Sequence, residues 1–413
     1  MSISIDIFFL MSHFHDILSD MSVSLPVFTP RSGADWAEPW SMYAALRDHS
    51  PVHHVEQGDY WVLTRHAHVM DAVRDHERFS SAQGLTTEYG ELERIGLAHN
   101  PPMVMTDPPV HTDFRRLVSR GFTPRQVETV EPMVRAFVTD RLETLRAAGG
   151  GDIVRDLFKP LPSMVVAHYL GVPEADHGRF DGWTDAIVTA NANGDAGASA
   201  EAVVELIGYF SDLIERRRGE PADDVVSHLV AAGESDSDDG VLRILAFTFT
   251  MVAGGNDTTT GLLGAGIPLL AERPEQRAKV PADVPAAVEE LLRLTSPVQG
   301  LARTTTEDVP IDGVTIPAGR KVLLSYAAAN RDPRWFGDDA DELDVTRAPR
   351  QILSFAHGAH HCLGAAAARM VGRVALGETL RLLPDFTVVP GSVTWAPGSY
   401  VRRPLSVVVE VGS

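Results

Sequence analysis

Apolar residues recur every three to four positions along most of the chain, which is the spacing of amphipathic helices. Together with the Pro and Gly residues that separate the apolar runs, this pattern predicts a mainly α fold with small β-sheets at its margin. Helices are expected over residues 39–49, 66–76, 108–119, 125–148, 161–170, 174–192, 200–218, 223–231, 239–273, 282–294 and 363–383.

Alternation of apolar and polar residues is confined to shorter stretches, and strands are expected at 51–63, 309–324 and 386–411. The segments 80–106 and 194–199 fit neither pattern. Because long irregular segments of compact proteins are often binding loops or lids, both segments are candidates for such a role.

The segment 241–270 is apolar enough to be considered as a membrane span, which needs about 20 such residues. Asp257 lies at its middle, and Gly254-Gly255 together with the threonines after Asp257 would loosen a helix exposed to lipid. The segment instead predicts a buried central helix whose hydrogen-bond ladder opens at its midpoint, although a polar interruption of an ordinary core helix fits equally well. Pro268 is expected to end or kink this helix early.

The composition narrows the class of protein. The 413 residues include 36 Lys and Arg against 56 Asp and Glu, and the net charge of −20 argues against a nucleic-acid-binding protein. A single cysteine, Cys362, excludes an internal disulfide. The first thirty residues contain no Lys or Arg, so no export signal is visible. We therefore expect a disordered extension at 1–24, one folded domain at 25–413 and a cytoplasmic location.

The strongest chemical signal is the stretch 355–364, Phe-Ala-His-Gly-Ala-His-His-Cys-Leu-Gly, which leads into the last long predicted helix. A thiolate of Cys362 at a helix N-terminus would be stabilised by the helix dipole and by free backbone amides. Gly358 lets the loop turn tightly, and Gly364 lets a planar ring approach closely, because neither residue has a Cβ. A lone cysteine is more often a buried structural residue, so it is the loop spacing that favours a ligand role.

Two pairs of charged residues are spaced to share a helix face. Glu290 and Arg293 stand at i and i+3, and most such pairs are solvated surface contacts. His111 and Arg115 stand at i and i+4 after Pro108-Pro109, where proline can start a helix. This second pair could bind two carboxylates or could belong to a solvated basic face.

The stretch 355–364 resembles the haem-binding signature Phe-x-x-Gly-x-x-x-Cys-x-Gly of the cytochrome P450 family, with matches at Phe355, Gly358, Cys362 and Gly364. The Glu290/Arg293 pair resembles the Glu-x-x-Arg motif of that family, and 254–259 resembles its oxygen-activation motif, Ala/Gly-Gly-x-Asp/Glu-Thr. Two positions depart from the family pattern: Ala356 replaces a common glycine, and Val371 stands where Glu is frequent.

The resemblance implies the mainly α cytochrome P450 fold and a haem-thiolate monooxygenase. The axial ligand of haem b would be Cys362, whose thiolate favours O–O cleavage. The residues that match the family's propionate-binding positions are His111, Arg115, Arg303 and His360. Asp257 and Thr258 would deliver protons during oxygen activation. Arg347 would join Glu290 and Arg293 in a buried network.

The resemblance also implies a lipophilic small-molecule substrate, O2, and electrons from a separate ferredoxin and an NAD(P)H-dependent reductase, since no flavin or iron–sulfur segment is visible. Sterols, terpenoids, fatty acids, macrolides and amines all remain open as substrates. The pocket segments expected by family position are 84–105, 187–198, 249–253, 298–302 and 399–401. The arginines expected to receive the ferredoxin are Arg115, Arg116, Arg120, Arg350, Arg369 and Arg373.

Other functions fit parts of the sequence. The three histidines of 355–364 could form a hydrolase zinc site with Cys362, although Gly358 within the segment disfavours a closed tetrahedral site. A Cys-His nucleophile also fits the composition. A haem-binding sensor or ligand-sequestering protein would suit the cysteine loop equally well, but it would not need Asp257 and Thr258.

Overall fold

The computed structural model describes residues 27–193 and 196–412, and the predicted extension at 1–24 lies outside these residues. The described chain is mainly helical, as predicted, with small sheets. Its α-helices are α2 (Trp40–His49), α3 (His66–Arg74), α4 (Glu91–Arg94), α5 (Val110–Val118), α6 (Pro124–Ala147), α7 (Pro160–Leu170), α8 (His177–Asn193), α9 (Ala200–Gly219), α10 (Val225–Ala231), α11 (Asp238–Ala271), α12 (Pro274–Arg277), α13 (Val284–Thr295), α14 (Tyr326–Ala329), α15 (Pro333–Phe336) and α16 (Ala365–Leu382).

The long helices confirm the periodicity within a few residues at each end, and Pro268 does not end the central helix. Helix α11 continues through Pro268 to Ala271. A proline this close to the C-terminus removes one backbone hydrogen bond of the last turns. Leu270 in the final turn is fully buried, so packing holds the helix beyond the proline. The irregular segment 80–106 contains the short α4.

The main sheet has five strands in the order β1-β2-β8-β5-β3, in which β2 and β8 are parallel and the other neighbours are antiparallel. The strands are β1 (Val52–Val55), β2 (Tyr60–Leu63), β3 (Phe79–Ser80), β4 (Gly150–Asp152), β5 (Leu301–Thr305), β6 (Val309–Ile311), β7 (Val314–Ile316), β8 (Lys321–Leu324), β9 (Thr387–Val388), β10 (Thr394–Trp395), β11 (Pro404–Ser406) and β12 (Val408–Glu410). Strand β5 was not predicted. Four of its five residues are buried, so it shows no alternation of apolar and polar positions.

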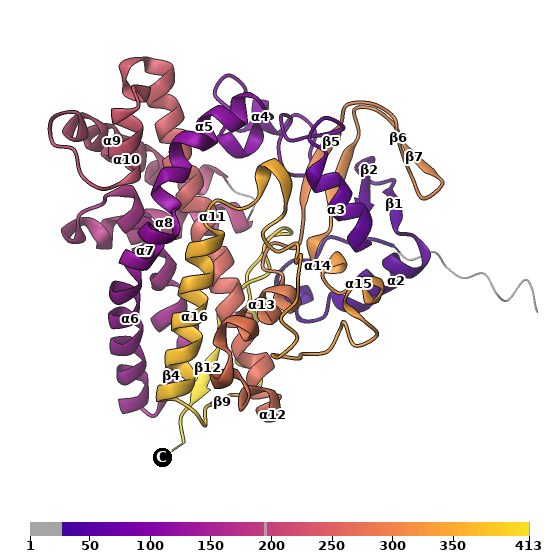
Figure 1. Ribbon diagram of the computed structural model, residues 1–413, viewed down its shortest axis with the longest axis vertical. Helices are drawn as coiled ribbons and strands as arrows, with labels where there is room; N and C mark the ends of the chain where they lie inside the picture. Colours follow the sequence, from indigo (N-terminus) through magenta and orange to yellow (C-terminus); the bar gives the residue numbers. More distant parts are fainter. Residues whose placement is uncertain (1–26, 194–195, 413) are drawn as a thin grey trace, which may run out of the picture.

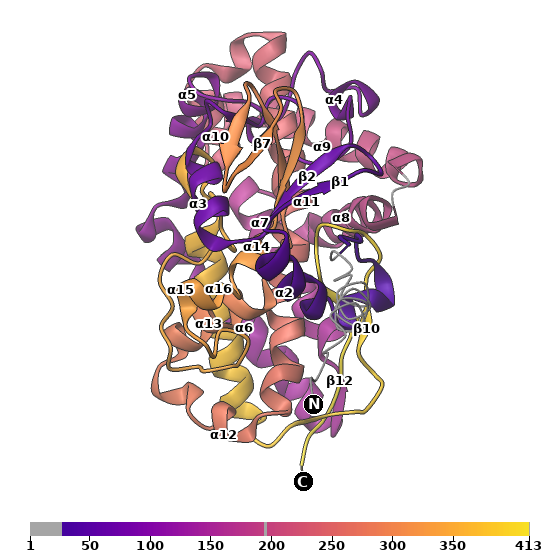
Figure 2. The same cartoon turned by 90° about the vertical axis from the view of Figure 1, so that its right-hand side faces the viewer.

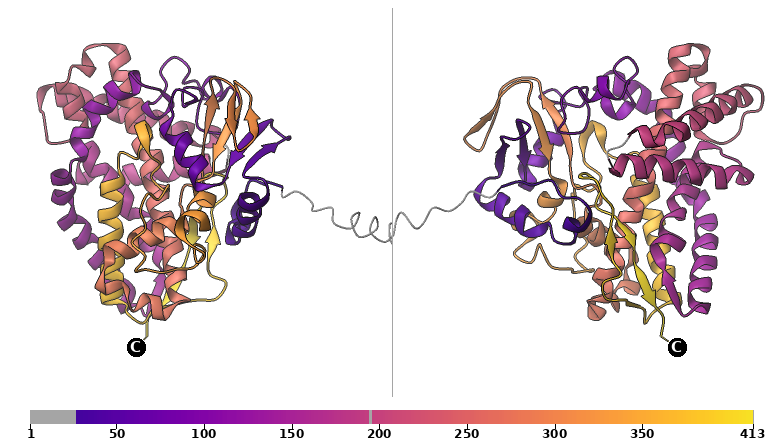
Figure 3. Two further views of the ribbon diagram at one scale, coloured as in Figure 1. Left: turned by 45° about the vertical axis from the view of Figure 1, so that its right-hand side comes forward. Right: turned by 180° about the vertical axis from the view of Figure 1, so that it is seen from behind.

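Helix α11 runs through the length of the helical body and lies beside α16, against which α6 and α13 also pack (Figure 1). Seen from the sheet side, β1, β2 and β7 lie in front of this body (Figure 2). The two views in Figure 3 show the sheet on one side of the molecule and α6 and α9 on the other. One large apolar core joins the helices, and two smaller cores lie at the sheet.

In the part of the chain that the structure describes, no helix has the length and apolar character needed to cross a bilayer. The single-domain organisation at 25–413 stays a prediction.

Candidate functional site

A backbone hydrogen bond and left-handed backbone conformations shape the cysteine loop, residues 355–364. The Cys362 amide donates to the Phe355 carbonyl at 2.9 Å and closes the loop just before α16. Gly358 has φ of +70°, and a Cβ there would lie 2.6 Å from the Val73 carbonyl oxygen of α3, so only glycine fits. Ala356 has φ of +50°, in the left-handed region. This conformation explains why glycine is common at that position and what the alanine costs, about 1 kcal/mol.

Cys362 faces a space that the protein encloses. Its side chain is exposed by area, yet burial raises the pKa of its thiol, against the opposing effects of the Gly364 amide and of Arg115 and Arg369. The two observations agree if protein atoms surround the Cys362 side chain but leave the space in front of its sulfur empty. A Cβ built at Gly364 meets no atom within 4 Å, which agrees with open space beside the loop.

Buried and half-buried nitrogen donors gather near this loop from three different elements. His111 of α5 is 1% exposed, and neither of its ring nitrogens has a hydrogen-bond partner within the described chain. Its ring lies 4.2 Å from the ring of His360, which contacts the Ser81 hydroxyl at 3.2 Å. Arg303 of β5 is 4% exposed. Arg115 donates to the His361 carbonyl at 2.5 Å.

Burial keeps the two imidazoles of this cluster neutral. Burial, Arg303 and His111 lower the pKa of His360 to about 3. Burial and Arg115 also lower the pKa of His111. Because an unpartnered buried polar group costs about 1–3 kcal/mol, the free ring nitrogens of His111 point to a missing partner. Two cations and two neutral imidazoles would suit an anion.

The middle of α11 lacks the open hydrogen-bond ladder that the sequence predicts. The helix is α-helical throughout, so the predicted opening of its hydrogen-bond ladder is wrong. The Thr258 hydroxyl donates to the Gly254 carbonyl at 3.1 Å, adding a bond to the ladder without breaking it. Gly254 is exposed although it lies mid-helix, and a Cβ there would meet no atom within 4 Å. The glycine therefore borders an open space.

Asp257 and Thr258 are adjacent in sequence but are about 100° apart around the helix. The Asp257 carboxylate forms an ion pair with Arg403 at 2.6 Å. Burial raises the pKa of Asp257 to about 6, and Arg403 opposes that rise. The two motif residues thus have different surroundings.

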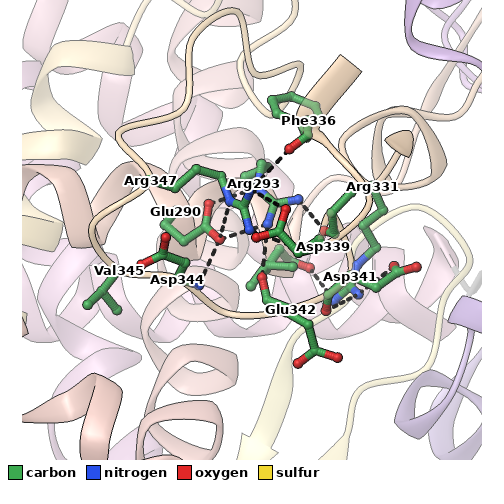
Figure 4. Close-up of polar contacts among 12 residues, drawn as sticks. Glu290, Arg293, Arg331, Phe336, Asp339, Asp341, Glu342, Asp344, Val345 and Arg347 are labelled. Carbon is green, nitrogen blue, oxygen red and sulfur yellow. Dashed lines mark hydrogen bonds and ion pairs between the residues drawn. The ribbon is translucent and has the colours of Figure 1, made fainter. Parts of the chain in front are cut away.

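The predicted network around Glu290 is present and buried (Figure 4). Glu290 accepts two hydrogen bonds from Arg293, at 2.7 and 2.8 Å, and one from Arg347 at 3.1 Å. The Asp344 amide adds a fourth at 3.1 Å. Glu290 and Arg293 are fully buried, so the surface alternative for this pair is wrong.

Backbone hydrogen bonds join three of the expected pocket segments. The Ala302 amide donates to the Leu85 carbonyl at 2.7 Å, and the Gln299 amide donates to the Tyr400 carbonyl at 2.8 Å. The Thr87 amide donates to the Tyr400 hydroxyl at 3.0 Å. A fourth segment, 249–253, lies on α11, and the fifth falls partly outside the described residues.

Sequence reasoning missed Arg403, Lys159 and Asp185, all of which act electrostatically on Asp257. No motif or helical spacing links them to that position. Within the described ranges, no group of three or more His, Cys, Asp or Glu side chains is arranged to hold a metal ion, so the zinc alternative finds no ligand cluster.

Comparison with known proteins decides the family. A model described as Cytochrome P450 matches residues 283–392. Cytochrome P450 130 of Mycobacterium tuberculosis is 65% identical over 403 residues, which cover 95% of this chain and 100% of that protein. This chain belongs to the cytochrome P450 family.

Two more distant P450s support the assignment. The Vitamin D(3) 25-hydroxylase of Pseudonocardia autotrophica is 38% identical over 367 residues, which cover 87% of this chain and 90% of that enzyme. The crystal structure of CYP109E1 from Bacillus megaterium in complex with testosterone matches with a TM-score of 0.80 at 29% identity, covering 91% of this chain and 100% of that chain. This P450 is a monooxygenase that binds haem b, so the hydrolase and sensor alternatives are wrong.

The residues of the site fit that cofactor. Haem needs an axial ligand for its iron, which a cysteine thiolate can supply, and donors for its two carboxylates. The accessible thiol of Cys362 and the unpartnered nitrogens of His111 fit these needs.

Proposed function

We propose that this P450 inserts one oxygen atom of O2 into a lipophilic small molecule, with Cys362 as the haem ligand. The observation that carries the proposal is the accessible thiol of Cys362 near buried His111, whose ring nitrogens have no hydrogen-bond partner in the described chain. Bound haem supplies the cleavage of O2, which electron donation by a thiolate favours. The overall change is R–H + O2 + 2 electrons + 2 protons → R–OH + H2O. Residues 25–413 would form one haem domain, and a cytoplasmic location stays a prediction.

The haem carboxylates would be held by the buried donor cluster. Arg115 and Arg303 supply positive charge, and the neutral rings of His111 and His360 each offer one N–H donor. Arginine suits this task because its planar guanidinium can bind a carboxylate through two parallel bonds. The remaining loop residues, Phe355, Gly358 and Gly364, would shape the slot under the ring.

Asp257 and Thr258 would handle the two protons. A carboxyl whose pKa is about 6 exchanges protons readily near neutral pH, as a general acid should. The Thr258 hydroxyl lies one turn from the open space beside Gly254 and is fixed by its bond to that carbonyl. It would orient the oxygen that receives the proton. Glu290, Arg293 and Arg347 would keep the scaffold rigid.

The substrate would be a lipophilic molecule of steroid, terpenoid or macrolide type. The CYP109E1 structure contains testosterone, and another relative is a Vitamin D(3) 25-hydroxylase. The pocket segments of this chain carry few charges. Titrating the purified protein with such compounds while recording its absorption spectrum would identify ligands. Product analysis by mass spectrometry would then show whether a tight ligand gains one oxygen atom.

The thiolate ligand has a direct test. The reduced, CO-treated protein should show the absorption maximum of thiolate-ligated haem, and Cys362→Ser should lose it while keeping the fold. His361→Ala is the matched control, because His361 is the neighbouring residue and presents its carbonyl, which the variant retains, to Arg115. A histidine-type CO spectrum that Cys362→Ser leaves unchanged would overturn the proposal.

A separate ferredoxin, reduced by an NAD(P)H-dependent reductase, would dock on the arginines around Cys362. Arg116 is 73% exposed and has one weak ion pair with Asp113 at 3.5 Å. Long-range attraction accelerates association and is screened by salt. Arg116→Glu should therefore slow ferredoxin-supported reduction most at low ionic strength. Arg146→Glu is the control, since Arg146 lies in the last turn of α6, at the other end of the molecule from α5 (Figure 1). Equal slowing by both variants would contradict this docking surface.

A further inference from the structure

Glu91 and Lys321 are buried charged residues that the proposed mechanism does not use. Glu91 lies in the irregular segment 80–106, whose pattern makes it a candidate binding loop or lid, and Lys321 lies in the sheet beside it. A buried charge has lost its contacts with water and needs hydrogen bonds in their place. The partners of these two side chains therefore show what they hold.

The Glu91 carboxylate organises the chain that precedes it. Its Oε2 atom accepts hydrogen bonds from the Leu85 amide at 2.9 Å, from the Thr86 amide at 2.8 Å and from the Thr86 hydroxyl at 2.7 Å. Gly84 has φ of +99°, and a Cβ there would overlap this same carboxylate oxygen. Hydrogen bonds to a carboxylate are stronger than those to a neutral acceptor, so Glu91 fixes the path of residues 84–86.

Lys321 of β8 fastens the same part of the chain to the main sheet. Its ammonium group donates to the Gln83 carbonyl at 2.7 Å, and its backbone amide donates to the Tyr89 hydroxyl at 3.2 Å. Burial lowers the pKa of Lys321, as does Arg303, whereas Glu91 opposes this effect. The carboxylate of Glu91 thus helps to keep the lysine charged and able to donate.

Two further hydrogen bonds tie residues 83–87, the anchored segment, to other expected pocket segments. The Ala302 amide of β5 donates to the Leu85 carbonyl at 2.7 Å. The Thr87 amide donates to the Tyr400 hydroxyl at 3.0 Å. The anchored segment is therefore held by the sheet, by the C-terminal segment and, through Glu91, from within the loop.

The second half of the irregular segment is held differently. Within the described chain, the backbone hydrogen bonds of residues 94–105 all stay inside 90–106. No sheet residue fastens this half through its backbone, so the two halves of the loop differ in how firmly they are fixed.

We propose that Glu91 is a positioning residue of the substrate pocket: together with Lys321 it holds the anchored segment as a pocket wall that is complete before substrate binds. This inference rests on the proposed function, which places the segment at the pocket. A wall formed in advance needs little ordering when a ligand binds, so it selects ligands by their fit. Residues 83–87 then act as a wall and not as a lid.

Hydrogen–deuterium exchange of the substrate-free holoenzyme measures the anchoring without any turnover. In Glu91→Gln a neutral amide oxygen replaces the carboxylate, so peptides that cover residues 83–87 should exchange about tenfold faster. Glu93→Gln is the matched control, because Glu93 lies in the same short helix with an exposed side chain. Its exchange at 83–87 should equal that of the wild type. Unchanged exchange in Glu91→Gln, or equal acceleration in the control, would overturn the proposal.

A pair of glycine variants tests the same contact without removing a charge. Gly84→Ala should accelerate exchange at 83–87 because its Cβ displaces the Glu91 carboxylate. Gly313→Ala is the control for backbone strain, since Gly313 has φ of +80° and a Cβ there meets no atom within 4 Å. Equal exchange at 83–87 in the two variants would show that the contact with Glu91 does not hold the segment.

The role of the wall is read from two probes that bind haem iron through a ring nitrogen, imidazole and 4-phenylimidazole. Only the second probe extends a phenyl ring into the pocket. In Glu91→Gln the dissociation constant of 4-phenylimidazole should rise about three- to tenfold, because the ligand must now order the wall, while that of imidazole stays unchanged. In Gly313→Ala both constants should match the wild type. Faster exchange at 83–87 with both constants unchanged in Glu91→Gln would mean that the segment is anchored without shaping the pocket, and would refute the proposal.

These measurements separate the inference from the proposed function. Loss of the thiolate-type CO spectrum would refute the role of Cys362 but would leave the exchange difference between Glu91→Gln and Glu93→Gln standing. Equal exchange in those two variants would refute the role of Glu91 alone, because haem ligation does not depend on it.

Discussion

This P450 has two clusters in which an acidic side chain pairs with arginine inside the protein. They differ in the number of hydrogen bonds that the acidic side chain accepts. Glu290 accepts four hydrogen bonds, three of them from two arginines (Figure 4). Asp257 is held by one arginine, Arg403. Both acids pair with arginine, but Glu290 and Arg293 are fully buried, whereas the side chains of Asp257 and Arg403 are 17% and 7% exposed.

The difference separates a structural acid from an acid that can exchange a proton. Arg293 also donates to the carbonyls of Asn330 and Ala340, so the Glu290 cluster ties α13 to the segments after α14 and α15. Asp257 has no comparable set of donors, and burial outweighs Arg403 and raises its pKa to about 6. A single donor in a buried place leaves the charge of Asp257 open to change.

The largest effect should follow from breaking the first cluster. Glu290→Gln removes the charge that faces Arg293 and Arg347. The buried Arg293 guanidinium then has no counter-charge, whereas Arg347 keeps its ion pair with Asp339. Loss of one member of a buried pair costs about 3–5 kcal/mol, so the unfolding free energy should fall by that amount. Denaturant unfolding and haem content per chain measure the loss. A variant with wild-type stability would show that the four hydrogen bonds do not hold the scaffold.

Breaking the second cluster should impair turnover and not folding. Asp257→Asn should fold and bind haem, yet turnover should fall by about 10²–10⁴, the usual value of positioned proton transfer. Thr258→Ala should keep consuming reductant while releasing hydrogen peroxide. The ratio of product to reduced nicotinamide, measured with a ligand from the binding titrations, checks both. A Thr258→Ala enzyme with wild-type coupling would refute the proposed role of the hydroxyl.

The pH dependence of stability should also distinguish the clusters. The pKa of Asp257 is raised in the folded state, so its contribution to stability is present below about 3.8 and is lost as pH rises through about 6. Relative to Asp257→Asn, the wild type should therefore lose up to about 3 kcal/mol between pH 4 and pH 7. Parallel denaturant titrations of the two proteins at each pH give the difference. A constant difference would mean that Asp257 has the same pKa in both states.

The sequence predicts more of the fold than of the electrostatics. Long helices such as α11 and α16 are visible because their apolar spacing persists over many turns. Strand β5 was missed because a strand buried on both faces has no alternation. Helix α11 continues past Pro268 to Ala271 because packing of the last turn outweighs local propensity.

The residues of the site can also be predicted from the sequence only where their pattern is local. The spacing of Phe355, Gly358 and Cys362 is local, so resemblance to a family motif identifies it. Arg403 approaches Asp257 only because Gly261 lets two distant segments meet, and no local pattern encodes that contact. The structure brings His111 and His360 into ring contact from separate elements, which the sequence could suggest only through family positions. Their roles at the haem stay proposals.

The smallest effect should come from Glu289, the residue next to Glu290. Glu289 forms a two-bond ion pair with Arg369, at 2.5 and 3.0 Å, but the two side chains are 24% and 39% exposed. Water can replace the lost partner there, and exposed pairs are worth about 0–1 kcal/mol. Glu289→Gln should therefore lower the unfolding free energy by less than about 1 kcal/mol and leave haem content unchanged. Because the two glutamates share a helix and both pair with arginine, equal losses in Glu289→Gln and Glu290→Gln would show that burial does not separate them.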